Sequence, residues 1–350
     1  MVISTKFIST KKSIVLGKLF FILYICSIMN QIEAQGVYFS QYYSSPLVLN
    51  PAYTGQHEDK FRIVSNTHVQ GNYFNENVIS GTLSYDQQII IKRAEIGVGA
   101  CYTYDRSLAS NFPKQSINLS FASALSVSER SGLGLGIQVG YNNMFISYDH
   151  LSFPEQYNRD TGGFDTSLPI SENFDENNSD YVNVNAGLVW SYKMSKSYLS
   201  TGISVRHLNS PSYHLTDIKS SISQRYIYHV VYKNYANNQF HFTPRFLFSH
   251  QSSINYFMVG SSMQVNKDFG LDSAKGYFFG AYYAFREEID ANSLIAVLGF
   301  EKRMFTAMLT GDFNINKKVG NVHNQAFEIT FIIRRPALVL RKTIVPWVSH

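Results

Sequence analysis

The stretch that decides the fold is Gly132-Leu133-Gly134-Leu135-Gly136-Ile137-Gln138-Val139-Gly140-Tyr141. Large apolar side chains stand at every second position, and small or polar residues stand between them. Because successive side chains of a β-strand point to opposite faces, this alternation predicts a strand with one apolar and one polar face. A helix would instead repeat its apolar residues at intervals of three and four.

The same alternation recurs in 182–192, 96–104 and 117–121. One face of each segment is apolar and often ends in Tyr or Trp, whereas the other carries mostly Gly, Ser, Asn and Gln, with few charges. Such polar faces would make a poor core for a soluble sandwich, which buries apolar residues from both sheets. They favour a membrane barrel, in which the apolar face meets lipid and the polar face lines a hydrated lumen.

The composition agrees with a membrane barrel. Aromatic residues make up 15% of the chain and charged residues only 16%, against about 25% charged residues in typical soluble domains. After residue 34 no run of 18 or more apolar residues occurs, so spanning helices are not expected. A closed barrel is the other structure that satisfies every backbone polar group within lipid.

Counting the alternating windows predicts an all-β, antiparallel transmembrane barrel of about 14 strands. The strands are expected to begin near Phe61, Val78, Glu95, Gln115, Gly132, Tyr181, Tyr198, Ser223, Phe240, Asn255, Gly276, Ser293, Arg303 and Asn324. Short turns are expected at 126–131 and 193–196, and long connections at 142–180 and 206–222. If the N-terminus is periplasmic, both long connections are extracellular, which is the usual asymmetry.

Residues 1–34 are predicted to be a secretory signal peptide. Lysines including Lys11 and Lys12 precede an apolar run that begins at Leu19, and cleavage is expected after Ala34. The remaining chain divides into an N-terminal segment at 35–60, the barrel at 61–333 and a C-terminal tail at 334–350. Of the two cysteines, Cys26 lies in the signal, so Cys101 has no partner for an internal disulfide.

The segment from Tyr38 to Gly55 reads Y-F-S-Q-Y-Y-S-S-P-L-V-L-N-P-A-Y-T-G. Two prolines and a glycine exclude a long helix or a central strand, so we expect an irregular segment held in the lumen or at the periplasmic mouth. The segment resembles the N-terminal signature of the PorP/SprF family of outer-membrane proteins of the type IX secretion and gliding machinery of Bacteroidetes-type bacteria. The matching positions are Phe39, Ser40, Gln41, Tyr42, Pro46, Leu47, Leu49, Asn50, Pro51, Ala52 and Gly55.

Looser similarity to the family extends to about residue 333, for example in 81–87 and in Phe327-Glu328-Ile329. The resemblance implies a non-enzymatic outer-membrane component that supports export, surface anchoring or gliding function of a partner protein. The implied partners are periplasmic or outer-membrane lipoproteins of the secretion machinery and a secreted cell-surface protein, together with membrane lipid. The signature segment itself is expected either to plug the barrel or to bind a partner directly.

Catalysis, cofactors and metals find little support in the sequence. The histidines are scattered and no G-x-S-x-G motif occurs, so we expect no enzyme and no catalytic residues. The acidic connection contains Asp160, Asp165, Asp175, Glu176 and Asp180, but its spacing does not match a calcium loop, and a solvated loop is the favoured interpretation. No metal site, cofactor or nucleic-acid partner is expected. The alternative function is a passive porin. The tail contains basic residues, and it is interpreted either as a plain extension or as a contact with anionic lipid or a periplasmic partner.

Overall fold

The computed structural model describes residues 39–71, 78–91, 94–107, 112–145, 153–159, 161–165, 167–169, 178–215, 218–235, 239–268, 274–287, 291–315 and 325–336. Three short helices come first: η1 (Tyr42–Ser44), α2 (Pro46–Leu49) and η2 (Pro51–Tyr53). The predicted signal peptide lies outside the described residues. So does the tail beyond Pro336, whereas Arg334 and Arg335 belong to the last strand.

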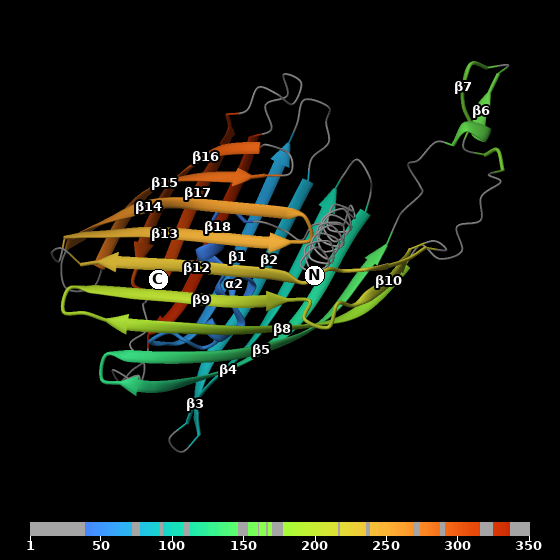
Figure 1. Ribbon diagram of the computed structural model, residues 1–350. Helices are drawn as coiled ribbons and strands as arrows, with labels where there is room; N and C mark the ends of the chain where they lie inside the picture. The colour runs from blue at the N-terminus through green and yellow to red at the C-terminus, as the bar shows by residue number, and fades with distance from the viewer. Residues whose placement is uncertain are drawn as a thin grey trace, which may run out of the picture. The chain divides into compact units, whose positions relative to one another are not determined.

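Within the described residues, fourteen strands form one closed antiparallel barrel (Figure 1). Their order around the wall is β1-β18-β17-β16-β15-β14-β13-β12-β9-β8-β5-β4-β3-β2, and β2 pairs with β1 to close it. The strands are β1 (Asp59–Gly71), β2 (Val78–Ile91), β3 (Ala94–Ser107), β4 (Phe112–Ser128), β5 (Ser131–Phe145), β8 (Asn178–Lys193), β9 (Ser197–Arg206), β12 (Arg225–Asn234), β13 (Phe240–Gln251), β14 (Ile254–Asp268), β15 (Ala274–Arg286), β16 (Ala291–Lys302), β17 (Phe305–Asn314) and β18 (Gln325–Pro336). The predicted fold and strand number are confirmed, and each expected start lies within three residues of an observed one.

The long connections carry small elements of their own. The β5–β8 connection contains η3 (Pro154–Gln156), β6 (Tyr157–Asn158) and β7 (Gly163–Phe164), and the β9–β12 connection contains β10 (Ser212–Leu215) and β11 (Ile218–Ser221). Both connections lie at one end of the barrel, because the backbone N–H of Leu208 donates to Val184 O and that of His214 donates to the Ser179 hydroxyl. We call this end the long-loop rim and the opposite end, with two-residue turns such as Glu129-Arg130, the short-turn rim.

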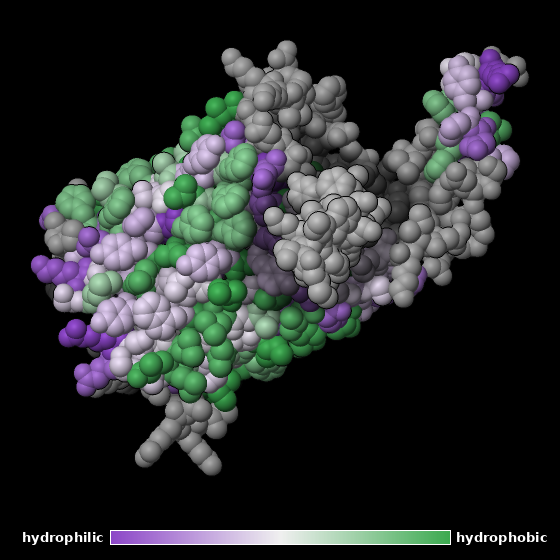
Figure 2. Space-filling view, in the orientation of Figure 1, coloured by the Kyte–Doolittle hydropathy of each residue, from purple (hydrophilic) through white to green (hydrophobic). Residues whose placement is uncertain are grey.

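The predicted inside–outside alternation is confirmed. In β5, Leu135, Ile137, Val139 and Tyr141 are exposed on the outer wall, whereas Gln138 is only 3% exposed and faces the lumen. Figure 2 shows apolar and weakly polar side chains over the visible wall and strongly hydrophilic ones at the short-turn rim. This is the surface that lipid requires between two aqueous rims.

The interior differs from the hydrated, weakly charged lumen that the sequence suggested. Part of the inner wall is apolar, with buried Ile227, Leu247, Met258, Ile295 and Val297. Other inward positions are charged and buried: Arg62, Asp86, Glu95, Arg225, Glu328 and Arg334. The apolar side chains form one core cluster with Tyr42, Tyr43 and Leu49 of the N-terminal segment. Arg62, Asp86 and Glu328 contact the same segment, which therefore fills part of the lumen.

In the described part of the chain, no helix has the length and apolar character needed to cross a membrane.

Candidate functional site

The segment from Phe39 to His57 lies inside the barrel, and we call it the lumen segment. It folds as three short helical turns, and prolines begin two of them: Pro46 starts α2 and Pro51 starts η2. Asn50 precedes Pro51, and its side-chain oxygen accepts a hydrogen bond from Ala52 N at 2.9 Å, which caps η2. Every residue of the lumen segment is buried except Val48, which is partly exposed.

All eleven signature residues predicted from the sequence therefore lie inside the lumen: Phe39, Ser40, Gln41, Tyr42, Pro46, Leu47, Leu49, Asn50, Pro51, Ala52 and Gly55. Of the two positions considered for the segment, the lumen is the one observed. Whether these residues also bind a partner stays a prediction.

The first attachment of the lumen segment is to two carboxylates of the far end of the chain. Ser40 N donates to Glu328 Oε2 at 2.7 Å, and Gln41 N donates to the same carboxylate at 3.3 Å. The Ser40 hydroxyl donates to Asp312, and the Gln41 side-chain amide donates to Thr310. Glu328 has no exposed surface, so these donors supply part of the hydrogen bonding that a buried carboxylate needs.

The middle of the lumen segment lies against strand glycines. A Cβ atom on Gly187 would lie 1.9 Å from Asn50 Oδ1, and one on Gly136 would lie 2.3 Å from Ala52 N. Asn50 uses this closeness, because its Nδ2 donates to the carbonyls of Leu188 at 3.2 Å and Ile203 at 3.1 Å. A side chain at either glycine would displace the segment, so the glycine-rich inner face is the surface on which the segment packs.

The second attachment joins Gly55, near the end of the segment, to Asp86 of β2, a carboxylate that also forms an ion pair with Arg62 of β1. Gly55 has a φ of 67°, a conformation that favours glycine, and its N–H donates to Asp86 Oδ2 at 2.8 Å. Asp86 also accepts from Arg62 Nε at 3.0 Å and Nη2 at 2.8 Å, a two-pronged pair that is almost fully buried. Close by, a Cβ on Gly97 would lie 1.8 Å from Thr54 O.

Aromatic residues of the lumen segment face the charged and apolar wall of the second half of the barrel. The Arg245 guanidinium lies over the Tyr43 ring, 4.1 Å from its centroid, and donates to the Tyr282 hydroxyl at 2.8 Å. Tyr42 packs edge-on against Tyr43. An arginine above an aromatic ring in a water-poor site is a favourable contact, so Arg245 fixes this side of the segment.

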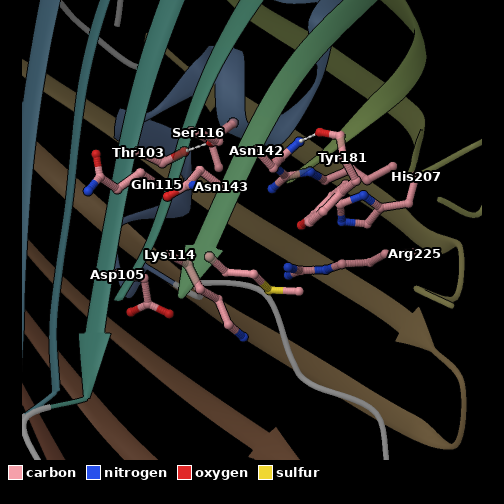
Figure 3. A pocket seen from close by; sticks show the side chains of 13 residues that line it. Thr103, Asp105, Lys114, Gln115, Ser116, Asn142, Asn143, Tyr181, His207 and Arg225 are labelled. Atoms are coloured by element: carbon pink, nitrogen blue, oxygen red, sulfur yellow. Dashed lines mark hydrogen bonds between the residues drawn. The ribbon is translucent and has the colours of Figure 1, made fainter. Parts of the chain in front are cut away.

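A cavity with about 90 Å³ open to water-sized molecules lies on the long-loop side of the segment (Figure 3). Val48 contributes to its lining, and the charged residues around it are Asp105, Lys114, Arg206 and Arg225, with His207 beside them. Burial, together with the charges of Arg206 and Arg225, lowers the pKa of His207 to about 3. His207 is therefore neutral at physiological pH.

A second cavity, of about 60 Å³, lies on the other side of the segment. Tyr43 and Ser44 of the segment contribute to its lining, together with wall residues near the short-turn rim, including Lys233, Glu301 and Arg334. Arg334 Nη1 and Glu301 Oε1 form an ion pair at 3.0 Å. The lumen segment thus contributes to the lining of a cavity toward each rim.

The wall partners of the segment were not identified from the sequence. Glu328 and Asp86 each stand between outward-facing residues in their strands, so the alternation assigns them to the lumen. The sequence therefore indicates that both side chains face the lumen. No local pattern indicates which part of the chain Glu328 and Asp86 bind. Among the acidic residues of the long connection, Asp160, Asp175 and Glu176 lie outside the described residues, and the described part contains no metal-binding cluster.

Comparison with solved structures finds outer-membrane barrels. The toluene transporter TbuX of Ralstonia pickettii is 9% identical, with a TM-score of 0.51 over 83% of this chain and 94% of that chain. The monoaromatic hydrocarbon channel CymD is 12% identical, with a TM-score of 0.51 over 84% of this chain and 93% of that chain. At such identities the likeness shows the fold alone. No curated protein matches the sequence. The family model described as type IX secretion system membrane protein PorP/SprF matches residues 31–333.

Proposed function

The chain belongs to the PorP/SprF family of type IX secretion system membrane proteins, and from this we propose that it is a non-enzymatic platform for a partner protein. It is an outer-membrane β-barrel and a component of that secretion system. In the proposed role the barrel supports export or surface anchoring of one secreted cell-surface protein. Lipoproteins of the machinery bind it from the periplasm or within the outer membrane.

The observation that carries this proposal is the packing of the lumen segment. Its backbone contacts wall glycines at positions 97, 136 and 187, and its ends bind the buried carboxylates of Glu328 and Asp86. Such a segment occupies lumen space that an open diffusion pore would need. A rigid, filled barrel presents fixed rims, and fixed rims suit recognition of other proteins.

The two rims suggest two classes of partner. Outer-membrane barrels place short turns in the periplasm and long loops outside the cell, so the long-loop rim is assigned to the cell surface. The secreted protein is then expected to bind at the long-loop rim and periplasmic components at the short-turn rim. In the same scheme residues 1–34 are a signal peptide removed during export.

The first test is a pull-down of the tagged protein from gently solubilised outer membranes, followed by mass spectrometry. We expect secretion-machinery lipoproteins and one large surface protein to co-purify. Recovery of the barrel alone, from cells that secrete normally, would contradict the platform role.

The alternative is a passive porin, which needs a continuous water path through the lumen. Reconstitution into planar bilayers distinguishes the two functions. The platform predicts no large steady conductance, because the lumen segment fills part of the lumen. A large, steady conductance of the purified barrel would support the porin instead.

A further inference from the structure

Arg245 of β13 faces the lumen without a carboxylate partner in the described part of the chain. Its Nη1 donates to the hydroxyls of Ser262 at 2.6 Å and Tyr282 at 2.8 Å, and to Thr243 O at 3.5 Å. Its guanidinium lies over the Tyr43 ring, 4.1 Å from the centroid. All four partners are neutral, and no ion pair of Arg245 occurs among the described residues.

One edge of this guanidinium has no acceptor within the described chain. All hydrogen bonds of Arg245 use Nη1, and Nε is buried without a partner. Nε and Nη2 together form the edge with which an arginine binds both oxygens of a carboxylate through two parallel hydrogen bonds. Leaving a charged donor unpaired in the protein interior is costly. The edge is therefore suited to an anion that comes from outside the described chain.

Arg245 lines the second cavity, which is open to water-sized molecules over about 60 Å³. The other charged residues in its lining are Lys233, Glu301 and Arg334. Glu301 and Arg334 form an ion pair and so balance each other. Lys233 has contacts of its own, and whatever compensates its charge, the charge of Arg245 remains. The cavity thus contains one cation to which the described residues offer no carboxylate.

Arg245 lies deep in the cavity, beside the lumen segment. Lys233 and Glu301 are next to the last residues of β12 and β16, at the short-turn rim. Arg245 is the sixth residue of β13, which begins at the same rim. Because a strand rises about 3.3 Å per residue, Arg245 lies roughly 13 Å further along its strand than those two residues lie along theirs. A ligand that enters from the short-turn rim therefore meets Lys233 and Glu301 first and Arg245 last.

The wall of the cavity is apolar beside this cation. Val231, Phe278, Met308 and Ile332 contribute to the lining, together with the Tyr43 ring. About 10–15 Å³ of such space holds one water, so the cavity has room for a carboxylate and a small aliphatic group. The lining thus favours a ligand that carries an anion and an apolar group close together.

We propose that the second cavity binds the C-terminal carboxylate of a polypeptide that enters from the short-turn rim and ends in an apolar residue. A chain terminus carries its carboxylate and its last side chain on one carbon atom, whereas an Asp or Glu side chain has nothing apolar beyond its carboxylate. Lipid headgroups are the less suitable source of an anion, because they lie outside the wall. That the ligand is a periplasmic polypeptide rests on the proposed platform function. Its carboxylate and apolar group rest on the lining.

The first test is direct binding to the purified full-length barrel in detergent. The probe is a fluorescent pentapeptide of glycine and serine that ends in leucine with a free carboxylate, and its counterpart ends in a leucine amide. We expect the acid to bind more tightly, and its binding to weaken with added salt. Arg245→Met should weaken binding of the acid about tenfold, because it removes a charge-assisted contact. The matched control is Arg130→Gln, an exposed arginine at the short-turn rim, which should bind as the parent does. Equal binding of acid and amide, or no effect of Arg245→Met, would overturn the proposal.

Two further ligands test the apolar group and the source of the carboxylate. A pentapeptide that ends in serine should bind more weakly than the one that ends in leucine, because it buries less apolar area. The free acid 4-methylpentanoate has the carboxylate and the side chain of leucine without a peptide. It should compete only weakly, because the peptide also contacts the residues near the rim. Equal affinity of this acid and the peptide would overturn the assignment to a polypeptide.

A second measurement keeps Arg245 and so does not depend on the folding of a variant at that position. Gln264 lines the second cavity, and Ser116 lines the cavity toward the long-loop rim. In a Cys101→Ser background, the acid peptide should slow the reaction of Gln264→Cys with methyl methanethiosulfonate and leave that of Ser116→Cys unchanged. Equal protection of both cysteines, protection of neither, or equal protection by the amide peptide would contradict the site.

Failure of this proposal and failure of the platform function give different results. Both measurements use the isolated barrel, so they succeed or fail regardless of which proteins co-purify from cells. If the acid peptide binds as expected but no partner is recovered in the pull-down, the carboxylate site stands and the platform function fails. If partners are recovered but the peptide does not bind, the platform stands and the site fails.

Discussion

Replacement of Gly97 by alanine tests the packing of the lumen segment most directly. A Cβ at this position would lie 1.8 Å from Thr54 O and 2.5 Å from Thr54 C. Both atoms are backbone, so no side-chain rotation relieves the contact. Since real Cβ contacts essentially never fall below 3.0 Å, the segment has to move by about 1 Å or leave its position.

The size of the effect follows from overpacking. Extra methyl groups in a well-packed interior cost about 1–3 kcal/mol. If this cost falls on the inserted state of the segment alone, the population of the displaced state rises by about 5- to 150-fold. A local opening of this kind need not unfold the barrel, because the strands keep their own hydrogen bonds.

The assay is labelling of a cysteine placed in the segment. Ser45 is 2% exposed and its hydroxyl makes no hydrogen bond within the described residues, so Ser45→Cys is a nearly neutral reporter. Cys101, which is also buried, is replaced by serine to remove the background. We expect Gly97→Ala to speed labelling of the Ser45→Cys reporter by about 5- to 150-fold.

The control is Gly81→Ala, a substitution in the neighbouring strand. Its Cβ would meet only Asn66 O, at an ordinary 3.6 Å, and should leave the labelling rate unchanged. If Gly97→Ala and Gly81→Ala label the reporter at the same rate, the close packing of the segment on β3 is refuted.

Substitutions at three positions test the attachments of the lumen segment. Asp86→Asn leaves the buried Arg62 without its full counter-charge and should lower the free energy of unfolding by about 3–5 kcal/mol. The loss is measured as a lower temperature at which the folded band disappears in electrophoresis. The control Glu129→Gln, in an exposed turn, should leave that temperature unchanged. Glu328→Ala should destabilise the barrel by about 1–3 kcal/mol, and Glu328→Gln by less, because an amide oxygen still accepts from the segment; equal losses would contradict the role of that oxygen. Arg245→Ala should speed labelling of the Ser45→Cys reporter more than Arg245→Lys does, because lysine keeps a cation near the Tyr43 ring. An identical labelling rate for both variants would exclude the contact between Arg245 and the ring.

The candidate site was predictable in part. The signature residues were identified by resemblance to a family, and their irregular conformation followed from Pro46 and Pro51. Their partners were not predictable in this way. Asp86 and Glu328 could be assigned to the inner face by their phase in the strands, but the expectation of few lumen charges was wrong. A single charged residue among many polar ones on the inner face of the strands does not stand out in the alternation. Inside a filled lumen the same residue forms a strong hydrogen bond or ion pair.

The sequence by itself determined the barrel, its fourteen strands and the side of each strand that faces lipid, because alternation is a local property that each strand carries in its own residues. Only the tertiary structure decided what fills the lumen. Ser40 meets Glu328 across 288 positions of the chain, and Arg206 meets Arg225 through the register of two strands joined by a long connection. Such contacts depend on how the sheet closes, and closure is a property of all the strands together.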